Sequence, residues 1–453
     1  MRLNILKLNS YEAVPVRTHE GAPARVLTAE QLLRRSVLSC MLWEKEFYED
    51  GAEIAARIRA LVPQVKAETV AELAVEARAA MKLRHVPLLL VREMARYASH
   101  RALVAETLGR VIQRADELSE FLAIYWADGR QPLSGQVKKG LASAFTRFDE
   151  YALAKYDRAG SVRLRDVLFL SHARPVDAAQ AALWKRLAGN ELATPDTWEV
   201  ALSAAGQGDG VSKREVWERL LAERRLGALA LLRNLRNLHE AGVREELVLG
   251  ELAAMKTERV LPFRFLAASR AAPQWEEALD TAMLRSLEGR AGSLAGHTVL
   301  LVDVSGSMDA VLSRRSEMKR TDAAFGLAIL LRELAEKVTI YTFSSEVRRV
   351  AARRGMALRD ALDKSQPHMA TFLGEAVKTA ERECAGYARL VAITDEQAHD
   401  HVADPSGRGY MINVASAKNG VGYGKWTHID GFSEAVVDYI AELERKEGAS
   451  ASN

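Results

Sequence analysis

Apolar residues recur at helical spacing along most of the chain between residues 27 and 290. They fall at every third or fourth position, which is the period of an amphipathic helix. Short breaks rich in Gly, Pro, Asp or Asn separate many of the stretches, as in DGRQPLS, DRAGS, HARPV and GQGDG. The pattern predicts successive antiparallel helices stacked as repeats. No fixed repeat length is visible, so an irregular helical domain is the alternative.

The expected helices share this periodicity and follow one another with short connections. They are TAEQLLRRSVLSCMLWE, VAELAVEARAAMKL, HVPLLLVREMARYAS, ALVAETLGRVIQ, ADELSEFLAIYW, SGQVKKGLASAFTRFDEYALAKY, RLRDVLFLSH, VDAAQAALWKRLAG, KREVWERLLAERR, LGALALLRNLRNLHEA and QWEEALDTAMLRSL. The sixth is the longest, and we expect it to be one continuous helix.

The pattern changes at the Gly-rich stretch GRAGSLAGH, close to residue 290. Beyond it, the apolar runs HTVLLVDVS, VTIYTFS, RLVAITD and YMINVAS have the character of buried strands. They alternate with the amphipathic stretches DAAFGLAILLRELAEK, LGEAVKTAERECA and FSEAVVDYIAELERK. Alternating strands and helices predict a parallel, doubly wound α/β sheet. The sequence therefore predicts two domains, a helical one over 1–290 and an α/β one over 291–453.

Composition is that of an ordinary globular protein, with 48% hydrophobic and 27% charged residues. Cys40 and Cys384 lie too far apart in the sequence for a metal motif, and two cysteines make no disulfide framework. The first residues lack the apolar core of a signal peptide, and no stretch suits a membrane span. These features predict a cytoplasmic protein that does not enter a membrane.

Positive charge is concentrated in one part of the helical region. The net charge of the whole chain is only +3. Between residues 130 and 190, however, eleven basic residues face five acidic ones, a net charge of +6. Such a concentration suits nucleic-acid binding, although solvated helix faces carry similar charges. Arg84, Arg92 and Arg96 could extend a basic surface toward the N-terminus.

Five oxygen-bearing side chains follow strands or precede a helix in the α/β region. Asp303 ends the strand VLLVD, and Ser305 and Ser307 follow it at two-residue offsets in the loop D-V-S-G-S. Asp395 ends the strand VAITD, and Thr371 precedes a helix in HMATFLGEAV. Carboxyl ends of parallel strands share one edge of a sheet, where ligands bind. Two carboxylates and three hydroxyls suit Mg²⁺, with Mn²⁺ or Ca²⁺ as alternatives, but not zinc.

This constellation resembles the metal-ion-dependent adhesion site of the von Willebrand A family. The resemblance covers roughly residues 298 to 445, and all five positions are present. It implies one divalent ion with a coordination position left for water or a partner carboxylate. A helix N-cap is the alternative role for the serines. A hydrolase is disfavoured, because the motif G-x-S-x-G is absent and no His is close to Asp303 in the sequence.

The helical region carries a second resemblance, in the segments RADELSEFLAIYW, PLSGQVKKGLASAF, DEYALAKYDR, VRLRDVLFLSHARP and ALALLRNLRNL. These segments resemble the TROVE domain of Ro proteins, and TROVE followed by a von Willebrand A domain is the Ro architecture. The resemblance implies a monomeric ring of HEAT-like helical repeats closed by the α/β domain. It also implies binding of small non-coding Y RNA and of single-stranded ends of misfolded RNA. In bacterial relatives, Y RNA tethers the ring to polynucleotide phosphorylase.

Six basic residues are the candidate RNA contacts, because they lie in or beside the matching segments. They are Lys138, Lys139, Lys155, Arg158, His172 and Arg174. Lys and Arg neutralise phosphates, and His can stack on a base or donate to a phosphate. For His172, a helix C-terminal cap is the alternative role. Aromatic residues are not clustered in the sequence, so we expect recognition of shape and backbone rather than of sequence.

The function predicted from the sequence is therefore a non-catalytic RNA-binding ring that acts in RNA quality control, maturation or decay. The main alternative is a protein-interaction scaffold in which the metal site captures a partner carboxylate. No phosphate-binding glycine motif is present, which disfavours nucleotide hydrolysis.

Overall fold

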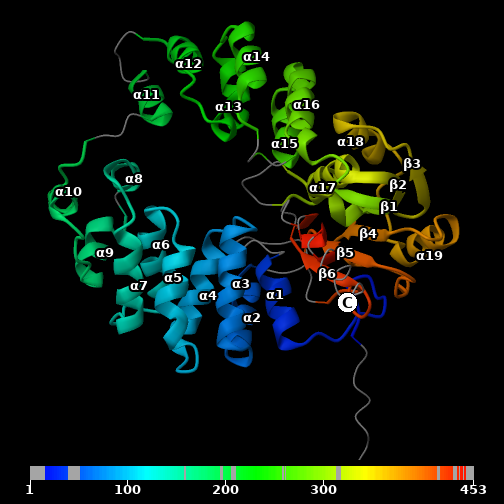
Figure 1. Ribbon diagram of the computed structural model, residues 1–453, viewed down its shortest axis with the longest axis horizontal. Helices are drawn as coiled ribbons and strands as arrows, with labels where there is room; N and C mark the ends of the chain where they lie inside the picture. The colour runs from blue at the N-terminus through cyan, green and yellow to red at the C-terminus, as the bar shows by residue number, and fades with distance from the viewer. Residues whose placement is uncertain are drawn as a thin grey trace, which may run out of the picture.

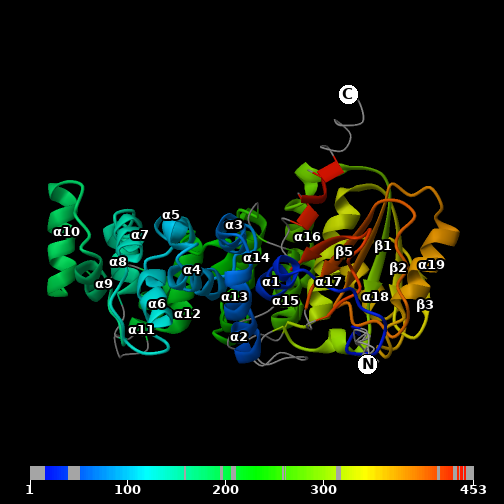
Figure 2. The ribbon, with the colours of Figure 1, turned by 90° about the horizontal axis from the view of Figure 1, so that it is seen from below.

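Helices and a sheet follow one another around a ring in the computed structural model (Figure 1). The structure describes residues 16–38, 51–157, 160–193, 197–205, 211–257, 260, 262–312, 318–415 and 419–431, and also 436, 437, 439–441, 443 and 444. Seen from below, the helical part extends away from the α/β part, with α10 at the far end (Figure 2). This arrangement confirms the predicted fold class, a helical-repeat ring followed by a doubly wound α/β domain.

The first ten helices form one side of the ring. They are α1 (Ala29–Leu38), α2 (Gly51–Leu61), α3 (Ala67–Ala79), α4 (His85–Arg96), α5 (Val104–Val111), α6 (Asp116–Tyr125), α7 (Gly135–Phe145), α8 (Glu150–Tyr156), α9 (Leu164–Ser171) and α10 (Ala178–Gly189). Within them, α3 packs on α5, α5 on α7, and α7 on α9. Their apolar faces share one core, which runs from Leu33 to Leu187.

Six further helices lead back to the α/β domain. They are α11 (Trp198–Ala205), α12 (Lys213–Ala222), α13 (Ala228–Glu240), α14 (Glu245–Ala254), α15 (Pro262–Ala271) and α16 (Glu276–Arg285). Their core is continuous with one face of the sheet, from Val216 on α12 to Ile412 in the sheet. The periodicity did not single out α2, α11, α14 or α15 as helices. Each has only 8 to 11 residues, and the mixed composition of α14 gives no apolar stripe.

Side-chain bonds between successive repeats reveal a repeat length that the sequence alone does not show. Six pairs of polar groups on neighbouring helices or on the connections between them bond at separations between 32 and 39 residues. The pairs are Arg78–Glu117, Arg84–Asp116, Arg186–Glu150, His100 with the carbonyl of Val65, Arg147 with that of Ile112, and Gln180 with that of Thr146. This near-constant spacing is that of a helical repeat of about 35 residues, which falls within the known range of such repeats.

The predicted continuous helix from Ser134 to Tyr156 is in fact two helices, α7 and α8. The break falls at Thr146–Asp149, where Asp149 adopts an extended conformation and its side chain accepts the N–H of Ala152. An aspartate in this position caps a new helix, because its carboxylate satisfies a free N–H of the first turn. Lys155 therefore lies on a helix of seven residues rather than at the end of a long one.

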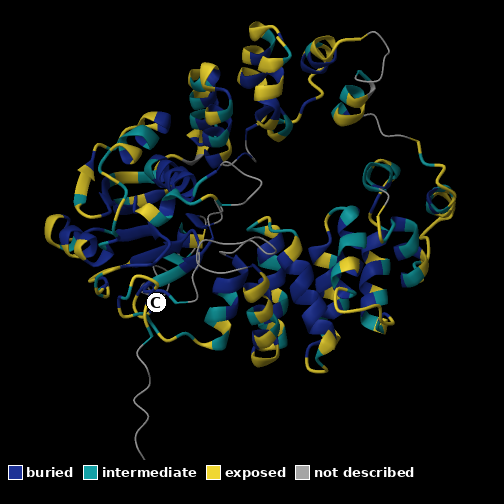
Figure 3. Cartoon of the chain, turned by 180° about the vertical axis from the view of Figure 1, so that it is seen from behind, coloured by how far each residue is buried: buried dark blue, intermediate teal, exposed yellow. Residues whose placement is uncertain are grey.

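The sheet has six strands in the order β3-β2-β1-β4-β5-β6. They are β1 (Leu294–Asp303), β2 (Ala335–Phe343), β3 (Val347–Val350), β4 (Arg389–Thr394), β5 (Gly409–Asn413) and β6 (Thr427–Asp430). All neighbours are parallel except β3, which pairs antiparallel with β2 at one edge. The central strands are buried (Figure 3). The closing helix expected over 432–446 lies largely outside the described residues.

Two layers of helix cover the sheet. The helices are α17 (Arg320–Leu334), α18 (Gly355–Asp363) and α19 (Leu373–Glu383). Residues alternate along β1, so that Leu300 and Val302 join the core shared with α17 and the helical array. Val299 and Leu301 face the opposite core, which includes residues of α19. Helices thus cover both faces of the sheet. Ligands can therefore bind at the edge formed by the carboxyl ends of the strands. No helix in the described ranges is long and apolar enough to span a bilayer.

The beginning of the described chain packs on the α/β domain. Ala22 lies in the core beneath the sheet, and the hydroxyl of Thr18 donates to the carbonyl of Ala398 at 2.8 Å. Helix α1 then contacts β6, so that the first helix lies beside the last strand (Figure 1). The ring is therefore closed at α1 as well as through α15 and α16.

Candidate functional site

Four of the five predicted metal ligands meet at the carboxyl edge of the sheet. Strands β1 and β4 are neighbours in register, and Asp303 and Asp395 end or follow them. The carboxylate of Asp303 accepts the backbone N–H of Ser305 at 2.8 Å and the hydroxyl of Thr394 at 2.5 Å. The hydroxyls of Ser305 and Ser307 lie 3.3 Å apart, and Ser307 donates to Asp395 at 2.6 Å. These four side chains thus lie close together at the edge where the strands end, as expected from their positions in the sequence.

The fifth residue, Thr371, is held beside this group through its backbone. The loop before it is tied to the serine loop, because the N–H of Gly306 donates to the carbonyl of Met369 at 2.9 Å. Thr371 is buried, and its carbonyl accepts the N–H of His399 at 2.9 Å. Within the described chain, no hydrogen bond joins its hydroxyl to the other four side chains. His368, the nearest His in sequence, instead contacts Asp309 at 2.9 Å.

The electrostatics of this edge suit a cation. Asp303 and Asp395 are both fully buried. Burial, and then repulsion from Asp395, raise the pKa of Asp303 to about 7. Two adjacent buried carboxylates are costly unless a positive charge balances them. The residues present therefore fit an ion held by carboxylates and hydroxyls. In the described parts of the chain, no cluster of three or more His, Cys, Asp or Glu side chains forms a metal site of another kind.

A buried arginine that the sequence reasoning missed also lies at this edge. Arg320 begins α17, is 1% exposed, and its Nη1 is 3.4 Å from Asp395. The available signal was a basic residue in the first turn of a helix, where the helix dipole disfavours positive charge. Arg320 offsets part of the negative charge from the protein side.

A second missed cluster begins one residue beyond Asp395. Glu396 is fully buried and has a φ of 62°, a left-handed conformation that is uncommon for residues with a side chain. Its carboxylate accepts from Arg35 of α1 at 2.9 Å and contacts His428 of β6. Burial would raise the pKa of Glu396, but Arg35 and His428 hold it well below its usual range.

The cluster extends through the imidazole of His428. Its Nδ1 lies 3.4 Å from Asp430, and Tyr423 stacks on its ring at a centroid distance of 4.1 Å. Burial alone would lower the pKa of His428, but Asp430 and then Glu396 outweigh it and raise the pKa to about 9. Residues from α1, the loop after β4, and β6 thus share one buried network of alternating charges.

Two of the predicted RNA contacts touch each other on neighbouring helices. Lys138 lies one turn into α7, and its Nζ is 3.4 Å from Nε2 of His172. His172 caps the C-terminus of α9 with a φ of 54°, so the capping role is real. Its imidazole is nevertheless exposed and turned toward the lysine.

The remaining predicted contacts differ in their surroundings. Lys139 and Arg174 are exposed, while Lys155 lies over the rings of Tyr151 and Tyr156. Arg158 lies outside the described residues. In the described part of the chain, neither Lys138, Lys139, Lys155 nor Arg174 forms an ion pair. These cations are therefore available to an anionic ligand.

The other arginines considered earlier are not available in this way. Arg84 pairs with Asp116 and Glu120, and Arg92 and Arg96 both pair with Asp128. Arg92 is completely buried. The idea that these three extend a basic surface is therefore wrong, because they link successive repeats.

Comparison with known proteins shows what this chain is similar to in sequence and in fold. Residues 173–323 match the TROVE domain. The crystal structure of the Deinococcus radiodurans Ro (RSR) protein superposes with a TM-score of 0.63, covering 93% of this chain and all of that chain at 19% identity. One segment of the chain thus matches the TROVE domain, and the fold of the chain resembles that of a Ro protein. The structural likeness extends through both the helical ring and the α/β domain.

Curated proteins similar to this chain include telomerase protein component 1 of Mus musculus and of Rattus norvegicus. They are 30% and 28% identical over 221 residues. The match covers 46% of this chain but only 8% of each relative. The TROVE match begins just beyond His172, so it includes Arg174 but not the other predicted RNA contacts. It extends through the serine loop of the α/β domain and into α17.

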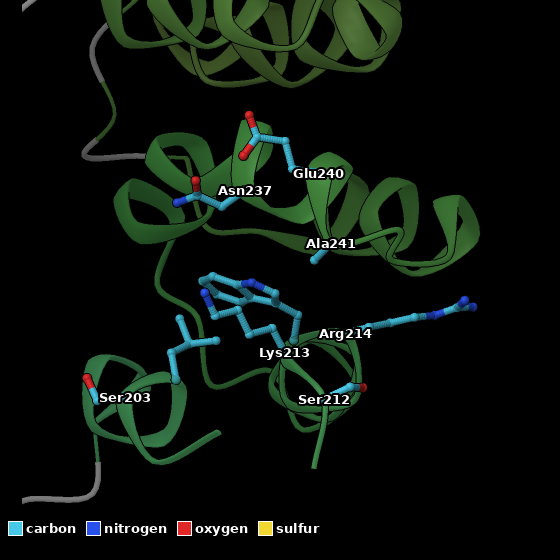
Figure 4. Close-up of a pocket in the computed structure, with 9 residues that line it drawn as sticks. Ser203, Ser212, Lys213, Arg214, Asn237, Glu240 and Ala241 are labelled. Atoms are coloured by element: carbon cyan, nitrogen blue, oxygen red, sulfur yellow. The ribbon is translucent and has the colours of Figure 1, made fainter. Parts of the chain in front are cut away.

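A cavity of about 750 Å³ lies apart from both sites, between α11, α12 and α13 (Figure 4). Three of its polar side chains are engaged locally. Ser212 caps α12, Asn237 donates to Asn234, and Arg214 pairs with Glu218. Figure 4 shows the Arg214 side chain pointing away from the other lining residues. These groups stabilise helices and do not converge on a ligand.

Proposed function

We propose that this protein is a non-catalytic RNA-binding ring. It binds small structured non-coding RNA of the Y RNA type and the single-stranded ends of misfolded RNA. In this role it serves RNA quality control, maturation or decay, and RNA bound to it tethers an exoribonuclease such as polynucleotide phosphorylase. The ring works as a monomer, because one chain supplies both the helical array and the domain that closes it.

The observation that carries this proposal is the group of unpaired cations on α7, α8 and the end of α9. Lys138, Lys155 and Arg174 lack carboxylate partners in the described chain, whereas Arg84, Arg92 and other arginines nearby have them. Phosphate groups are the partners that such cations attract most strongly in RNA. His172, beside Lys138, adds a group that can donate to a phosphate or stack on a base.

Gel shifts with an RNA hairpin that carries a single-stranded tail test the proposal. We expect the parent to bind in a salt-dependent manner. Lys138→Glu and Lys155→Glu should each weaken binding several-fold and lower the slope of log affinity against log salt by about 1. Both side chains lie at the surface, so their thermal melts should match that of the parent.

Lys364→Glu is the matched control. Its side chain is 75% exposed and lies on the α/β domain, away from α7 and α8. It changes the net charge by the same amount but should leave RNA affinity unchanged. Equal affinity of all three variants and the parent would show that the helical cations do not contact RNA.

The metal centre supports a second candidate role, protein capture. Asp303, Ser305 and Ser307, with Thr371 and Asp395, would hold Mg²⁺, which supplies a Lewis-acidic position for an oxygen ligand. Ser307 is only partly buried and Gly306 is exposed, so this edge faces solvent. A partner carboxylate could fill the free position. Loss of partner capture by Asp303→Ala, with RNA binding intact, would assign the site to this role.

A further inference from the structure

A second cavity lies close to the unpaired cations, at the ends of α6 and α9. Its volume is about 620 Å³, within the range of about 300–1,000 Å³ typical of ligand pockets. The lining combines aromatic, basic and acidic side chains. It consists of Ala123, Trp126, Arg130, Ser161, Val162, Asp166, Phe169 and Leu170.

Trp126 forms a fixed aromatic wall of this cavity. Its indole N–H donates to the carbonyl of Gln131 at 2.7 Å, and the amide of Gln131 donates back to the carbonyl of Tyr125 at 3.3 Å. The guanidinium of Arg130 lies over the indole, 5.1 Å from the ring centroid. The connection from α6 to α7 therefore presents a planar aromatic group with a cation beside it.

Phe169 is the apolar counterpart on α9, and it is 63% exposed. An exposed phenylalanine gains little from folding, because most of its apolar surface stays in water. Its neighbours Val167 and Leu168 on the same helix are buried, as the amphipathic pattern requires. Phe169 thus departs from the helical pattern, and it does so at a cavity that already holds an indole and a guanidinium.

The chain segments that line the cavity lead directly to the Lys138–His172 pair. Phe169 precedes His172 by three residues, and the N–H of His172 donates to the carbonyl of Phe169 at 3.3 Å. Ser134, which caps α7, follows the Arg130 connection and precedes Lys138 by one turn. His172 thus lies one turn beyond Phe169, and Lys138 lies in the first turn of the helix that follows the Trp126–Arg130 connection.

We propose that this cavity holds an unpaired nucleobase of the bound RNA, stacked against Phe169 and the Trp126–Arg130 pair while Lys138 and His172 take the adjoining phosphate. The inference rests on the proposed RNA-binding function and specifies what the surface recognises. Aromatic and guanidinium planes stack on any base, and nearby cations follow the backbone. The cavity would let the protein distinguish single-stranded RNA from a duplex without reading sequence.

The test compares two RNAs of equal length, a hairpin with a single-stranded tail and a blunt hairpin. Phe169→Ala should weaken binding of the tailed RNA about 5- to 100-fold, the loss expected for one stacked base. Binding of the blunt hairpin should be unchanged. Phe169→Tyr keeps the ring and should restore tailed-RNA affinity. A 2-aminopurine placed in the tail should be quenched on binding to the parent but not to Phe169→Ala.

Leu229→Ala is the matched control, because Leu229 is an exposed apolar residue of α13, 48% exposed and far from this cavity. It should bind both RNAs as the parent does. If Phe169→Ala binds tailed RNA as tightly as the parent while Lys138→Glu binds it weakly, the stacking pocket is wrong and the RNA-binding function stands. If Lys138→Glu and Lys155→Glu also bind normally, the helical cations do not contact RNA and the proposed function itself fails.

Discussion

The helical array meets the α/β domain at two interfaces, called seams below, that are held by different kinds of interaction. At the seam of α15 with α17, a single apolar core runs from the helices into the sheet and includes Phe265 and Leu327. Gly326 of α17 lies so close to α15 that an added Cβ would come within 3.1 Å of the Cβ of Phe263. This seam is hydrophobic packing, and its residues are part of the shared core.

At the seam of α1 with β6, the contact is a buried network of charges. Arg35 crosses from the helical side to Glu396, and His428 and Asp430 complete the set. Opening the first seam would expose apolar surface, which water does not compensate. Opening the second would expose charges that water solvates well. The difference teaches that hydrophobic packing joins the ring at one seam, whereas a buried network of charges contributes at the other.

The substitution expected to have the largest effect on the difference between the two seams is the removal of Arg35. Arg35→Ala breaks a buried ion pair and removes one of the two cations that contact Glu396, and breaking a buried pair usually costs about 3–5 kcal/mol. Thermal melts should show a large loss of stability. Hydrogen exchange should show loss of protection in α1 and β6, with α15 and α17 still protected. The seams would differ as described only if the two pairs of elements respond separately.

Arg34→Ala is the control for Arg35→Ala, since the two residues are neighbours on α1. Arg34 pairs with Glu76, but both side chains are about one-third or more exposed, and such pairs contribute about 0–1 kcal/mol. A small effect is expected. Equal destabilisation by the two substitutions would mean that the buried network has no special part in closing the ring.

The next largest effect should appear when pH is raised. The pKa of His428 is about 9 in the folded protein against an ordinary value of 6.5. Its contribution to stability is therefore complete below about pH 6.5 and is lost as pH rises through 9. The parent should lose more melting temperature between pH 7 and pH 10 than His428→Gln does. A constant difference between the two proteins over that range would contradict the charge network.

The smallest expected change in stability concerns the candidate metal site. Its residue Asp395 directly precedes Glu396 of the seam between α1 and β6. Added Mg²⁺ should raise the melting temperature of the parent, with a stabilisation of about 1.4 kcal/mol at tenfold over its Kd. Asp303→Ala should change the basal stability modestly, because it removes one of two repelling buried carboxylates, and should abolish the response. Asp309→Ala, outside the proposed ligands, should respond normally. A parent that melts identically with and without Mg²⁺ would argue against the site.

Most helices and strands can be predicted from the sequence, but the repeat length of the helical array and the break between α7 and α8 cannot. Helices such as α4 and α13 follow from apolar periodicity, and the strands from short buried runs. The repeat of about 35 residues stays invisible, because bonds such as Arg84–Asp116 set it through tertiary contact and need no repeated motif. The break at Asp149 was missed because the apolar pattern continues across it.

The residues of the candidate sites also differ in whether the sequence alone could bring them together. Asp303 and Asp395 could be paired from sequence alone, because each ends a strand of one parallel sheet. Arg35 and Glu396 could not, since 361 residues separate them and neither lies in a motif. The stacking cavity escaped for the same reason, because Trp126 and Phe169 come together only when α6 packs on α9.

The partners of the α1 seam have a consequence for synthesis of the chain. Arg35 leaves the ribosome 361 residues before Glu396 does. At about 5–20 residues per second, that delay lasts roughly 20 to 70 s. Throughout it, the helices from α2 onward can fold on one another while Arg35 still has water in place of its carboxylate. The ring is therefore an open crescent during most of its production, and its last joint is made only when the final strands arrive.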